Sequence, residues 1–371
     1  MLRRIIDWLR SDVWRIATIG LALVLGIVVL VFSVDGSNPD PVESGSEQPP
    51  TTTPVGDDSS DVAGDDDSSD VASDGESSGP AGGTEETNSA RSQVSSSKNF
   101  LAIKVDNAPG ARPQVGVAST TLLIEVPVEG GMTRFLTIHP SNASGVVGPV
   151  RSVRPVDVDL LPPLATIFVS SGGQETVLQA LAATGIPHID STTFEFLSGG
   201  RENPHDTFID LDVLMPLLAG SESDAFGLPT GELAEATGRA SSVELPIGPT
   251  ELRFVDGAYS RYESGEPFLV LDSLGGQPSP LVHETVIVIF VAQRFAGYGD
   301  SNGVPVLTFD VIGGGDLLVF HDGEVVEATW SRSAQEDPFV FLDGARRPFG
   351  IPEGSTYLAI VPRDLQVVFS P

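Results

Sequence analysis

Residues 35–98 place the strongest limit on what this chain can fold into. Asp, Ser, Gly, Thr and Pro dominate this segment, which has few large apolar side chains and repeats Asp-Asp-Ser-Ser-Asp-Val-Ala at 57–63 and 66–72. Such a composition cannot bury enough surface to offset the chain entropy lost on folding. We therefore expect a disordered acidic linker here, and a folded core only in the residues that follow it.

An uncharged apolar run of 19 residues, 16–34, precedes the linker. At ~1.5 Å per residue a helix of this length crosses a hydrocarbon layer of ~30 Å. Four arginines lie before the run, whereas every charged residue between the run and Arg91 is acidic. By the positive-inside rule this asymmetry predicts a cytoplasmic tail at 1–15, a single-pass signal anchor at 16–34 in the cell membrane, and extracytoplasmic folded domains. A cleavable signal peptide is the alternative, but the run is long and no clean small-residue cleavage site precedes the acidic stretch.

The charge balance and the lack of cysteine narrow the classes of partner. The chain has 51 acidic residues against 20 Lys and Arg, a formal net charge of −31, and no cysteine. Disulfides and lipid-modified cysteines are thereby excluded, and nucleic acid is repelled. The acidic repeats lack the alternating Asp, central Gly and terminal Glu of a calcium loop, so we expect no metal site in them. No cofactor is expected either.

The folded part is predicted to be α+β, with an α/β-like mixed-sheet domain at 99–240 and a largely antiparallel β domain at 247–371. In the first domain, short apolar runs predict strands at 100–105, 120–128, 134–139 and 166–170, and a helix at 174–183 with Leu178, Leu181 and Ala182 on its apolar face.

The second domain alternates β-branched or aromatic runs with turn signals. Strands are expected at 252–255, 284–293, 304–311 and 316–320, with a short helix-like piece at 232–237 before the domain begins. Asp322-Gly323 and Asp343-Gly344 are strong hairpin signals. Trp330 and Tyr357 are interpreted as core residues.

Three arginines stand close together against the acidic trend of the chain, namely Arg134, Arg151 and Arg154. Residues 99–205 contain 9 acidic and 6 basic residues, whereas residues 206–371 contain 25 acidic and 8 basic residues. Arginine recognises carboxylate and phosphate groups with two parallel hydrogen bonds. The cluster therefore predicts an anion site. Alternatively, the arginines pair with nearby carboxylates, such as Glu129, and simply hold a loop.

Further candidates lie near the arginines. Gly172 and Gly173 join a strand to a helix start, where free backbone N–H groups favour anions. His205, in a polar loop fixed by Pro204, is the histidine expected at the site. Asp106 and Glu129 are candidates for contact with a metal or a proton if the site is catalytic.

The chain resembles the YerB-like family of bacterial "putative lipoproteins". The resemblance spans most of 99–362 and is carried by several short motifs, namely Ile103-Lys104-Val105-Asp106-Asn107, Ala111-Arg112-Pro113-Gln114, Glu129-Gly130-Gly131, Gly148-Pro149-Val150-Arg151-Ser152 and Pro204-His205. It implies two domains of unknown function outside the cytoplasmic membrane, and it adds Asn107 and Ser152 to the candidate site. One departure is the absence of cysteine, which makes a transmembrane helix the expected anchor.

Two functions remain open. The first is a cell-envelope binding or accessory module, in which the arginines hold an anionic wall component or an envelope protein. The second is an enzyme acting on a phosphorylated or pyrophosphoryl lipid-linked envelope precursor. We favour the first, because the sequence has no evident activated nucleophile.

Overall fold

The computed structural model describes residues 100–165, 167–218 and 227–371. The predicted tail, transmembrane helix and linker therefore lie outside the described residues. Among the residues that are described, no helix is both long enough and apolar enough to cross a membrane.

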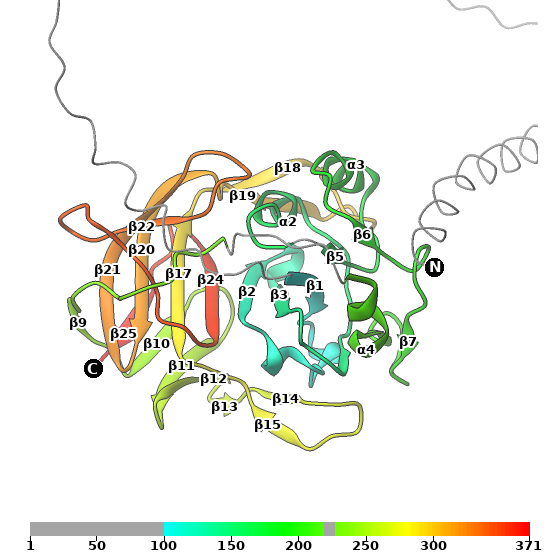
Figure 1. Cartoon of the computed structure of the whole chain (residues 1–371), viewed down its shortest axis with the longest axis horizontal. Coiled ribbons are helices and arrows are strands. Elements are labelled where there is room, and N and C mark those ends of the chain that lie inside the picture. Colours follow the sequence, from blue (N-terminus) through cyan, green and yellow to red (C-terminus); the bar gives the residue numbers. More distant parts are fainter. Residues whose placement is uncertain (1–99, 166, 219–226) are drawn as a thin grey trace, which may run out of the picture. The chain divides into compact units, whose positions relative to one another are not determined.

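Strands make up most of the fold, with few helices, so the architecture is mixed but predominantly β. Within the described residues the largest sheet has twelve strands (Figure 1). In spatial order eleven of them are β23 (Pro348–Phe349), β22 (Val340–Leu342), β21 (Glu324–Arg332), β20 (Gly313–His321), β17 (Thr285–Val291), β24 (Thr356–Pro362), β2 (Leu122–Pro127), β3 (Thr133–Pro140), β1 (Phe100–Asp106), β5 (Ile167–Val169) and β6 (His188–Ile189), while β9 (Gly238–Arg239) pairs with β21.

This sheet runs through both of the regions that the sequence separates. β24, near the carboxyl end of the chain, pairs in parallel with both β2 and β17. The antiparallel hairpin of β20 and β21 turns at Asp322-Gly323, with positive φ at both residues, as predicted. Because β2 and β24 are neighbours, strands of the two regions share one hydrogen-bonded sheet, and the described residues all belong to one compact unit. The boundary near 241–246 stays a prediction.

A second, antiparallel sheet and three smaller ones complete the strands. The second sheet has the order β13 (Glu266–Pro267), β12 (Ala258–Glu263), β11 (Thr250–Val255), β10 (Ser242–Leu245) and β25 (Val368–Ser370), with β16 (Val282–His283) beside β12. The smaller ones are the pairs β14 (Leu269–Leu271) with β15 (Pro278–Pro280) and β18 (Gln293–Gly299) with β19 (Pro305–Phe309), and the trio β4 (Val146–Val147), β8 (Thr207–Asp210) and β7 (Leu197–Ser198).

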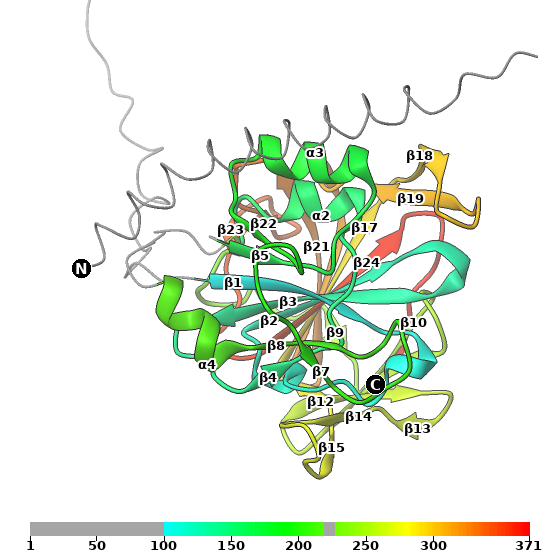
Figure 2. The ribbon, with the colours of Figure 1, turned by 90° about the vertical axis from the view of Figure 1, so that its right-hand side faces the viewer.

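Helices are short, and two of them lie against the large sheet. In Figure 2, α2 (Pro155–Leu160) and α3 (Glu175–Ala183) cover one face near β1 and β5. The others are α4 (Leu211–Leu214) and the 3-10 turns η1 (Pro109–Ala111), η2 (Val117–Ser119), η3 (Glu129–Gly131) and η4 (Met215–Leu218).

The α3 prediction is confirmed in position, but its buried face is formed by Val177 and Leu181, whereas Ala182 is exposed. The helix-like piece expected at 232–237 has no helical structure. Its backbone bonds instead to residues near 350, where Gly350 N donates to the carbonyl of Glu232.

Two apolar cores lie on the two faces of the large sheet. Alternation along β1 sends Phe100 and Ala102 into the core under α2 and α3, and Leu101, Ile103 and Val105 into the core shared with the second sheet. Trp330 and Tyr357 are buried, as predicted. Polar side chains on the same strands must therefore enter one core or the other.

Candidate functional site

The site begins where β1 ends and β3 starts. Asp106 is the last residue of β1 and lies directly opposite Arg134 of β3 in the antiparallel register. Directly opposed residues place their side chains on the same face of a sheet. Asp106 and Arg134 therefore both face the side covered by α2.

The loop 148–154 brings the other two arginines to this point. Asp106 N donates to the carbonyl of Pro149 at 2.9 Å, and Arg151 N donates to the carbonyl of Lys104 at 2.8 Å. On its other side, Val153 N donates to the carbonyl of Gly172 at 2.9 Å. The loop is thus fixed between β1 and the turn that follows β5.

Each arginine of this arginine cluster (Arg134, Arg151, Arg154) has a different partner. Arg151 Nε lies 3.0 Å from Asp106 Oδ2, an ion pair without hydrogen-bond geometry. Arg154 Nε lies 2.9 and 3.0 Å from the two oxygens of Glu129. Arg134 Nη1 donates to the carbonyl of Ser152 at 2.8 Å.

Arg134 is the least compensated of the three. It is 8% exposed, and among the described residues no carboxylate lies within ion-pair distance of its guanidinium group. Burial, followed by repulsion from Arg154 and Arg151, lowers the pKa of Arg134 to about 10. With two carboxylates against three guanidinium groups, the cluster has one positive charge in excess.

His205 reaches the same carboxylate from the loop before β8. Its Nδ1 lies 2.9 Å from Asp106 Oδ2. A Cβ at Gly110 would come within 2.9 Å of the imidazole ring, so the absence of a side chain there makes room for His205. Asp106 thus joins Arg151 and His205, and all three of these predicted site residues meet.

The Gly172-Gly173 turn contacts the loop 148–154, here called the arginine loop, through the carbonyl of Gly172 and the Cα of Gly173. The carbonyl of Gly172 accepts from Val153 N, and a Cβ at Gly173 would meet Val153 Cγ1 at 2.4 Å. These glycines therefore lie against the segment between Arg151 and Arg154. The contacts support the loop, whereas the backbone N–H role expected of the turn stays a prediction.

One buried ion pair beneath the cluster was missed by the sequence reasoning. Lys104 Nζ lies 2.6 Å from Asp157 Oδ1, and both side chains are fully buried. The other oxygen of Asp157 accepts from Arg154 N at 2.7 Å and so caps α2. Burial lowers the pKa of Lys104, and the charge of Asp157 opposes that shift. A single lysine in an apolar strand was the available signal, because a buried ammonium needs a carboxylate.

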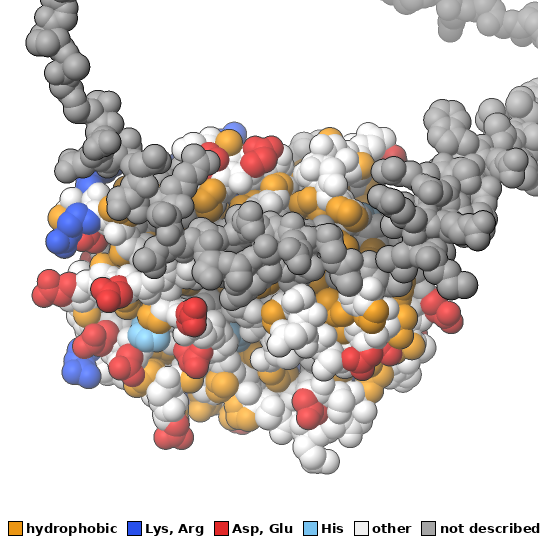
Figure 3. Space-filling model, viewed as in Figure 1, with side chains coloured by type: hydrophobic (Ala, Val, Ile, Leu, Met, Phe, Trp, Pro, Cys, Tyr) orange, Lys and Arg blue, Asp and Glu red, His pale blue; other side chains and the backbone are white. Residues whose placement is uncertain are grey.

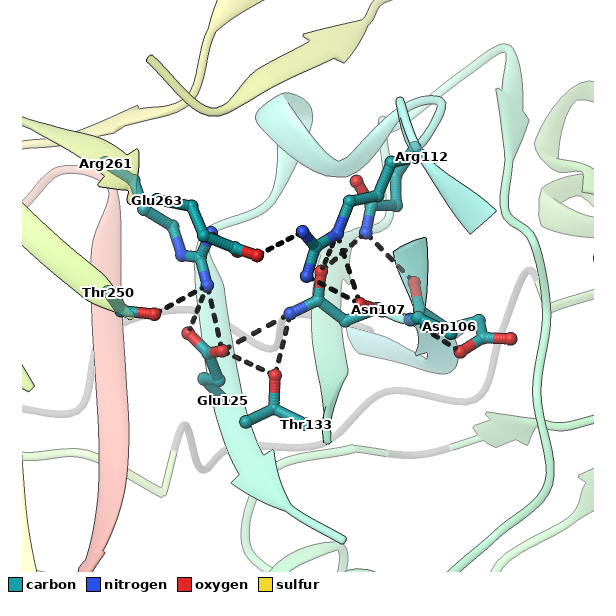
Figure 4. Close-up of polar contacts among 10 residues, drawn as sticks. Asp106, Asn107, Arg112, Glu125, Thr133, Thr250, Arg261 and Glu263 are labelled. Atoms are coloured by element: carbon teal, nitrogen blue, oxygen red, sulfur yellow. Dashed lines mark hydrogen bonds and ion pairs between the residues drawn. The ribbon is translucent and has the colours of Figure 1, made fainter. Parts of the chain in front are cut away.

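The opposite face of the same strand ends carries a second polar group, centred on Glu125 (Figure 4). Glu125 is fully buried. Its carboxylate accepts from Thr133 Oγ1 at 2.6 Å, Asn107 Nδ2 at 3.3 Å and Arg261 Nη2 at 3.0 Å, and also from the hydroxyl of Tyr357. These bonds occupy the acceptor capacity of the carboxylate.

A second carboxylate, Glu263, extends the group to Arg112. Glu263 Oε2 lies 3.1 Å from Arg261 Nη1, and its Oε1 bonds to Arg112 Nη1. Arg112 also donates to the carbonyl of Asn107 at 2.8 Å. We call Asn107, Arg112, Glu125, Thr133, Arg261 and Glu263 the carboxylate network. It joins strand ends of the first region to β12 of the second.

Asn107 is the one residue of this network that was predicted from the sequence as a site residue. Asn107 bonds to Glu125 and Thr133 and so lies in the carboxylate network, although it follows Asp106 directly. The signal for the rest was Glu125 itself, a lone acid in an apolar strand, which requires a buried donor set.

The charged side chains on one face of the molecule are mainly acidic. On the face shown in Figure 3, Asp and Glu side chains are scattered widely, whereas Lys and Arg appear mainly at one edge. No group of three or more metal-ligating His, Asp or Glu side chains occurs among the described residues. The arginine cluster is therefore a local exception to the charge of the chain.

Comparison with known proteins identifies the two halves of the folded part. Residues 86–223 match the "Protein of unknown function (DUF3048) N-terminal domain", and residues 250–358 match the corresponding C-terminal domain. The chain is 25% identical over 292 residues to "Putative lipoprotein YerB" of Bacillus subtilis, covering 74% of this chain and 85% of that protein.

A solved structure shares the fold. The crystal structure of the YerB protein from Bacillus subtilis has a TM-score of 0.62 and 23% identity, and the match covers 74% of this chain and 94% of that one. With both domains matched and the fold shared, the chain belongs to the YerB-like DUF3048 family, whose function is unknown.

Proposed function

We propose that this protein is an extracytoplasmic binding module of the cell envelope, and that its arginine cluster holds a carboxylate or phosphate group of an envelope component. The observation that carries the proposal is Arg134, a buried guanidinium flanked by Arg151 and Arg154 and without a carboxylate of its own among the described residues. A buried charge that lacks a counter-charge is costly, and a bound anion would remove that cost.

The partial exposure of Arg151 and Arg154 would let a dissolved anion reach the cluster. The side chains of Arg151 and Arg154 are 24% and 14% exposed, and the Nη atoms of Arg151 have no hydrogen-bond partner among the described residues. These atoms can serve an incoming oxyanion while Nε keeps its ion pair with Asp106. Backbone bonds hold the loop in place, so the arginines are preorganised.

Equilibrium dialysis of the full chain against inorganic phosphate tests this proposal. We expect one saturable site per chain, weakened about tenfold in Arg151→Lys, because lysine keeps the charge but loses the planar donor pair. Arg253→Lys is the matched control, since Arg253 pairs with Glu251 elsewhere on the surface. Phosphate binding that is equal in all three proteins would contradict the proposal.

The pair of Asp106 and His205 is the observation that favours an enzyme acting on a phosphorylated or pyrophosphoryl lipid-linked precursor. An imidazole oriented by a carboxylate through Nδ1 leaves Nε2 for proton transfer. Incubation of the full chain with inorganic pyrophosphate or p-nitrophenyl phosphate, with and without Mg²⁺, separates the two functions. Phosphate release that disappears in His205→Gln would favour the enzyme, and we expect none.

We also propose that residues 16–34 anchor the protein with its amino terminus in the cytoplasm. The relative named a lipoprotein supports an extracytoplasmic location, whereas the absence of cysteine from this sequence favours a helical anchor. Protease added to intact spheroplasts should digest residues 35–371 and spare residues 1–15. Protection of the folded part, or a mature chain that starts after residue 34, would contradict this topology.

A further inference from the structure

His205 and Arg151 meet at a single oxygen atom, Oδ2 of Asp106. The imidazole Nδ1 lies 2.9 Å from this oxygen, and Arg151 Nε lies 3.0 Å from it. The other oxygen of the carboxylate accepts from Ala108 N at 3.0 Å. Because Asp106 is buried, its negative charge is balanced by these neighbours rather than by solvent. The share of the Arg151 charge that is left for a ligand therefore depends on whether His205 is protonated.

The loop before β8 holds the imidazole ring in place. His205 N donates to the carbonyl of Glu202 at 2.9 Å, and Arg201 Nη2 donates to the carbonyl of Pro113 at 2.6 Å. The ring packs on Gly110, where a Cβ would come within 3.0 Å of its Nε2. Its side chain is 20% exposed, and Nε2 has no hydrogen-bond partner among the described residues. The ring can therefore exchange a proton with solvent while it stays beside the carboxylate.

The charge of the arginine cluster depends on this proton. Three guanidinium groups lie with two carboxylates, Asp106 and Glu129, so one positive charge is in excess when His205 is neutral. A protonated imidazole raises the excess to two. It also balances Asp106, which leaves Arg151 to pair with a ligand. Histidine is the side chain whose charge ordinarily changes between pH 5 and 8, so the site has two charge states near neutral pH.

Other charged side chains near the imidazole have partners of their own. They are Lys104 with Asp157, Arg112 with Glu263, and Arg201 with the carbonyls of Ala111 and Pro113. The loop of the histidine adds Glu202, which is exposed, and Asp206, which accepts from Ser198 Oγ at 3.4 Å. Within the described residues, Asp106 and Arg151 are therefore the charged groups that meet at His205.

We propose that the arginine cluster selects a doubly charged oxyanion and that His205 takes up a proton when this anion binds. A terminal phosphate monoester is such a group, with a charge of about −1.5 to −2 at pH 7, whereas a carboxylate or a phosphodiester carries a single negative charge. This inference rests on the proposed function and narrows its ligand to a phosphate monoester. His205 is a positioning residue here, because it acts on the ligand through Asp106 and Arg151.

Calorimetric titration of the full chain with sulfate at constant ionic strength tests the proposal. Sulfate keeps two negative charges between pH 6 and 8, so any proton taken up on binding goes to the protein. We expect the affinity to fall about tenfold from pH 6 to pH 8, and titrations in buffers of low and high ionisation enthalpy to show proton uptake at pH 7. Methanesulfonate has a similar shape but one charge, and its affinity should change less than about threefold.

Variants then show which group takes the proton. His205→Gln keeps a hydrogen-bond donor for Asp106 but cannot become charged, so sulfate binding should lose both its dependence on pH and its proton uptake. Asp106→Asn removes the charge that competes for Arg151, so binding at pH 8 should be about tenfold tighter than in the unaltered chain. His321→Gln is the matched control, because His321 bonds to Thr285 Oγ1 on β17.

The outcomes separate this inference from the proposed function. Sulfate that binds equally at pH 6 and pH 8, or that keeps its dependence on pH in His205→Gln, would overturn the role of His205 and leave the anion site in place. Methanesulfonate with the same proton uptake as sulfate would overturn the selection of a doubly charged anion. Absence of saturable sulfate binding at every pH would contradict the proposed function itself, and this inference with it.

Discussion

On one face of β1, β3 and β2 the arginine cluster has three guanidinium groups and two carboxylates, whereas on the other face the carboxylate network matches two guanidinium groups with two carboxylates. The carboxylate network lies deeper, since Glu125 and Arg261 are almost fully buried. The arginine cluster is partly open to solvent. The difference indicates that Glu125 and Arg261 hold the two regions together, and it supports the proposal that the arginine cluster binds an anion.

Removing Glu125 should produce the largest change in stability. Glu125→Ala removes the fully buried partner of Arg261 and leaves it only the partly exposed Glu263, which costs about 3–5 kcal/mol in the free energy of unfolding. Urea unfolding of the full chain measures this, with Glu251→Ala as the control, since an exposed ion pair such as Glu251 with Arg253 contributes little to stability. A loss for Glu125→Ala no larger than the control would contradict the role assigned to the network.

Acid should destabilise the fold through two buried histidines, one in each region. Burial lowers the pKa of His139 to about 3, and burial together with Arg261 lowers that of His283 to about 3. The unfolded chain, with a pKa of about 6.5, binds more protons between these values, so stability falls as the pH drops below 6.5. Each histidine should cost about 2 kcal/mol at pH 5.

The measurement is the free energy of unfolding from urea titrations between pH 4.5 and 7.5. His139→Gln should reduce the dependence on pH by about one proton, as should His283→Gln. His321→Gln is the control, since His321 is only partly buried and bonds to Thr285 Oγ1. An unchanged slope in both test variants would show that these histidines do not govern the acid response.

A change at Gly173 should disturb the arginine cluster alone. Gly173→Ala places a Cβ 2.4 Å from Val153 Cγ1 and forces the arginine loop to shift, at a cost of about 1–3 kcal/mol. Gly344→Ala is the control, because a Cβ there would have no neighbour within 4 Å. If Gly173→Ala binds phosphate as the unaltered chain does, the turn does not position the arginines.

Local patterns were enough to predict several elements of the fold. The apolar run at the start of β1, the helix α3 and the turn at Asp322-Gly323 all depend on neighbours in the sequence, and the structure confirms them. The pairing of β2 with β24 joins residues more than 200 positions apart, and no local pattern encodes it. The second region was therefore expected to be mainly antiparallel, without the parallel pairing of β17 and β24.

The site shows the same division between local and distant information. An excess of arginine is visible in composition, and the structure brings Arg134, Arg151 and Arg154 together with Asp106 and Glu129. Composition does not show which residues become partners in the folded chain. Arg261 lies 136 positions from Glu125, and Asp157 lies 53 from Lys104. Asp106 and Asn107 are neighbours in the sequence and were therefore assigned to one site. Strand alternation turns their side chains to opposite faces of the sheet, so each belongs to a different polar group.

The thermal stability of the full chain and of Arg151→Ala, with and without about 50 mM phosphate at constant ionic strength, tests the anion site most directly. A site with a Kd of about 10 mM would stabilise the native state by ~1 kcal/mol, which should appear as a higher Tm in the unaltered chain and in the control Arg253→Ala, but not in Arg151→Ala. Equal gains in all three proteins, together with a large loss of stability in Arg151→Ala without phosphate, would contradict the account and leave these arginines as part of the framework.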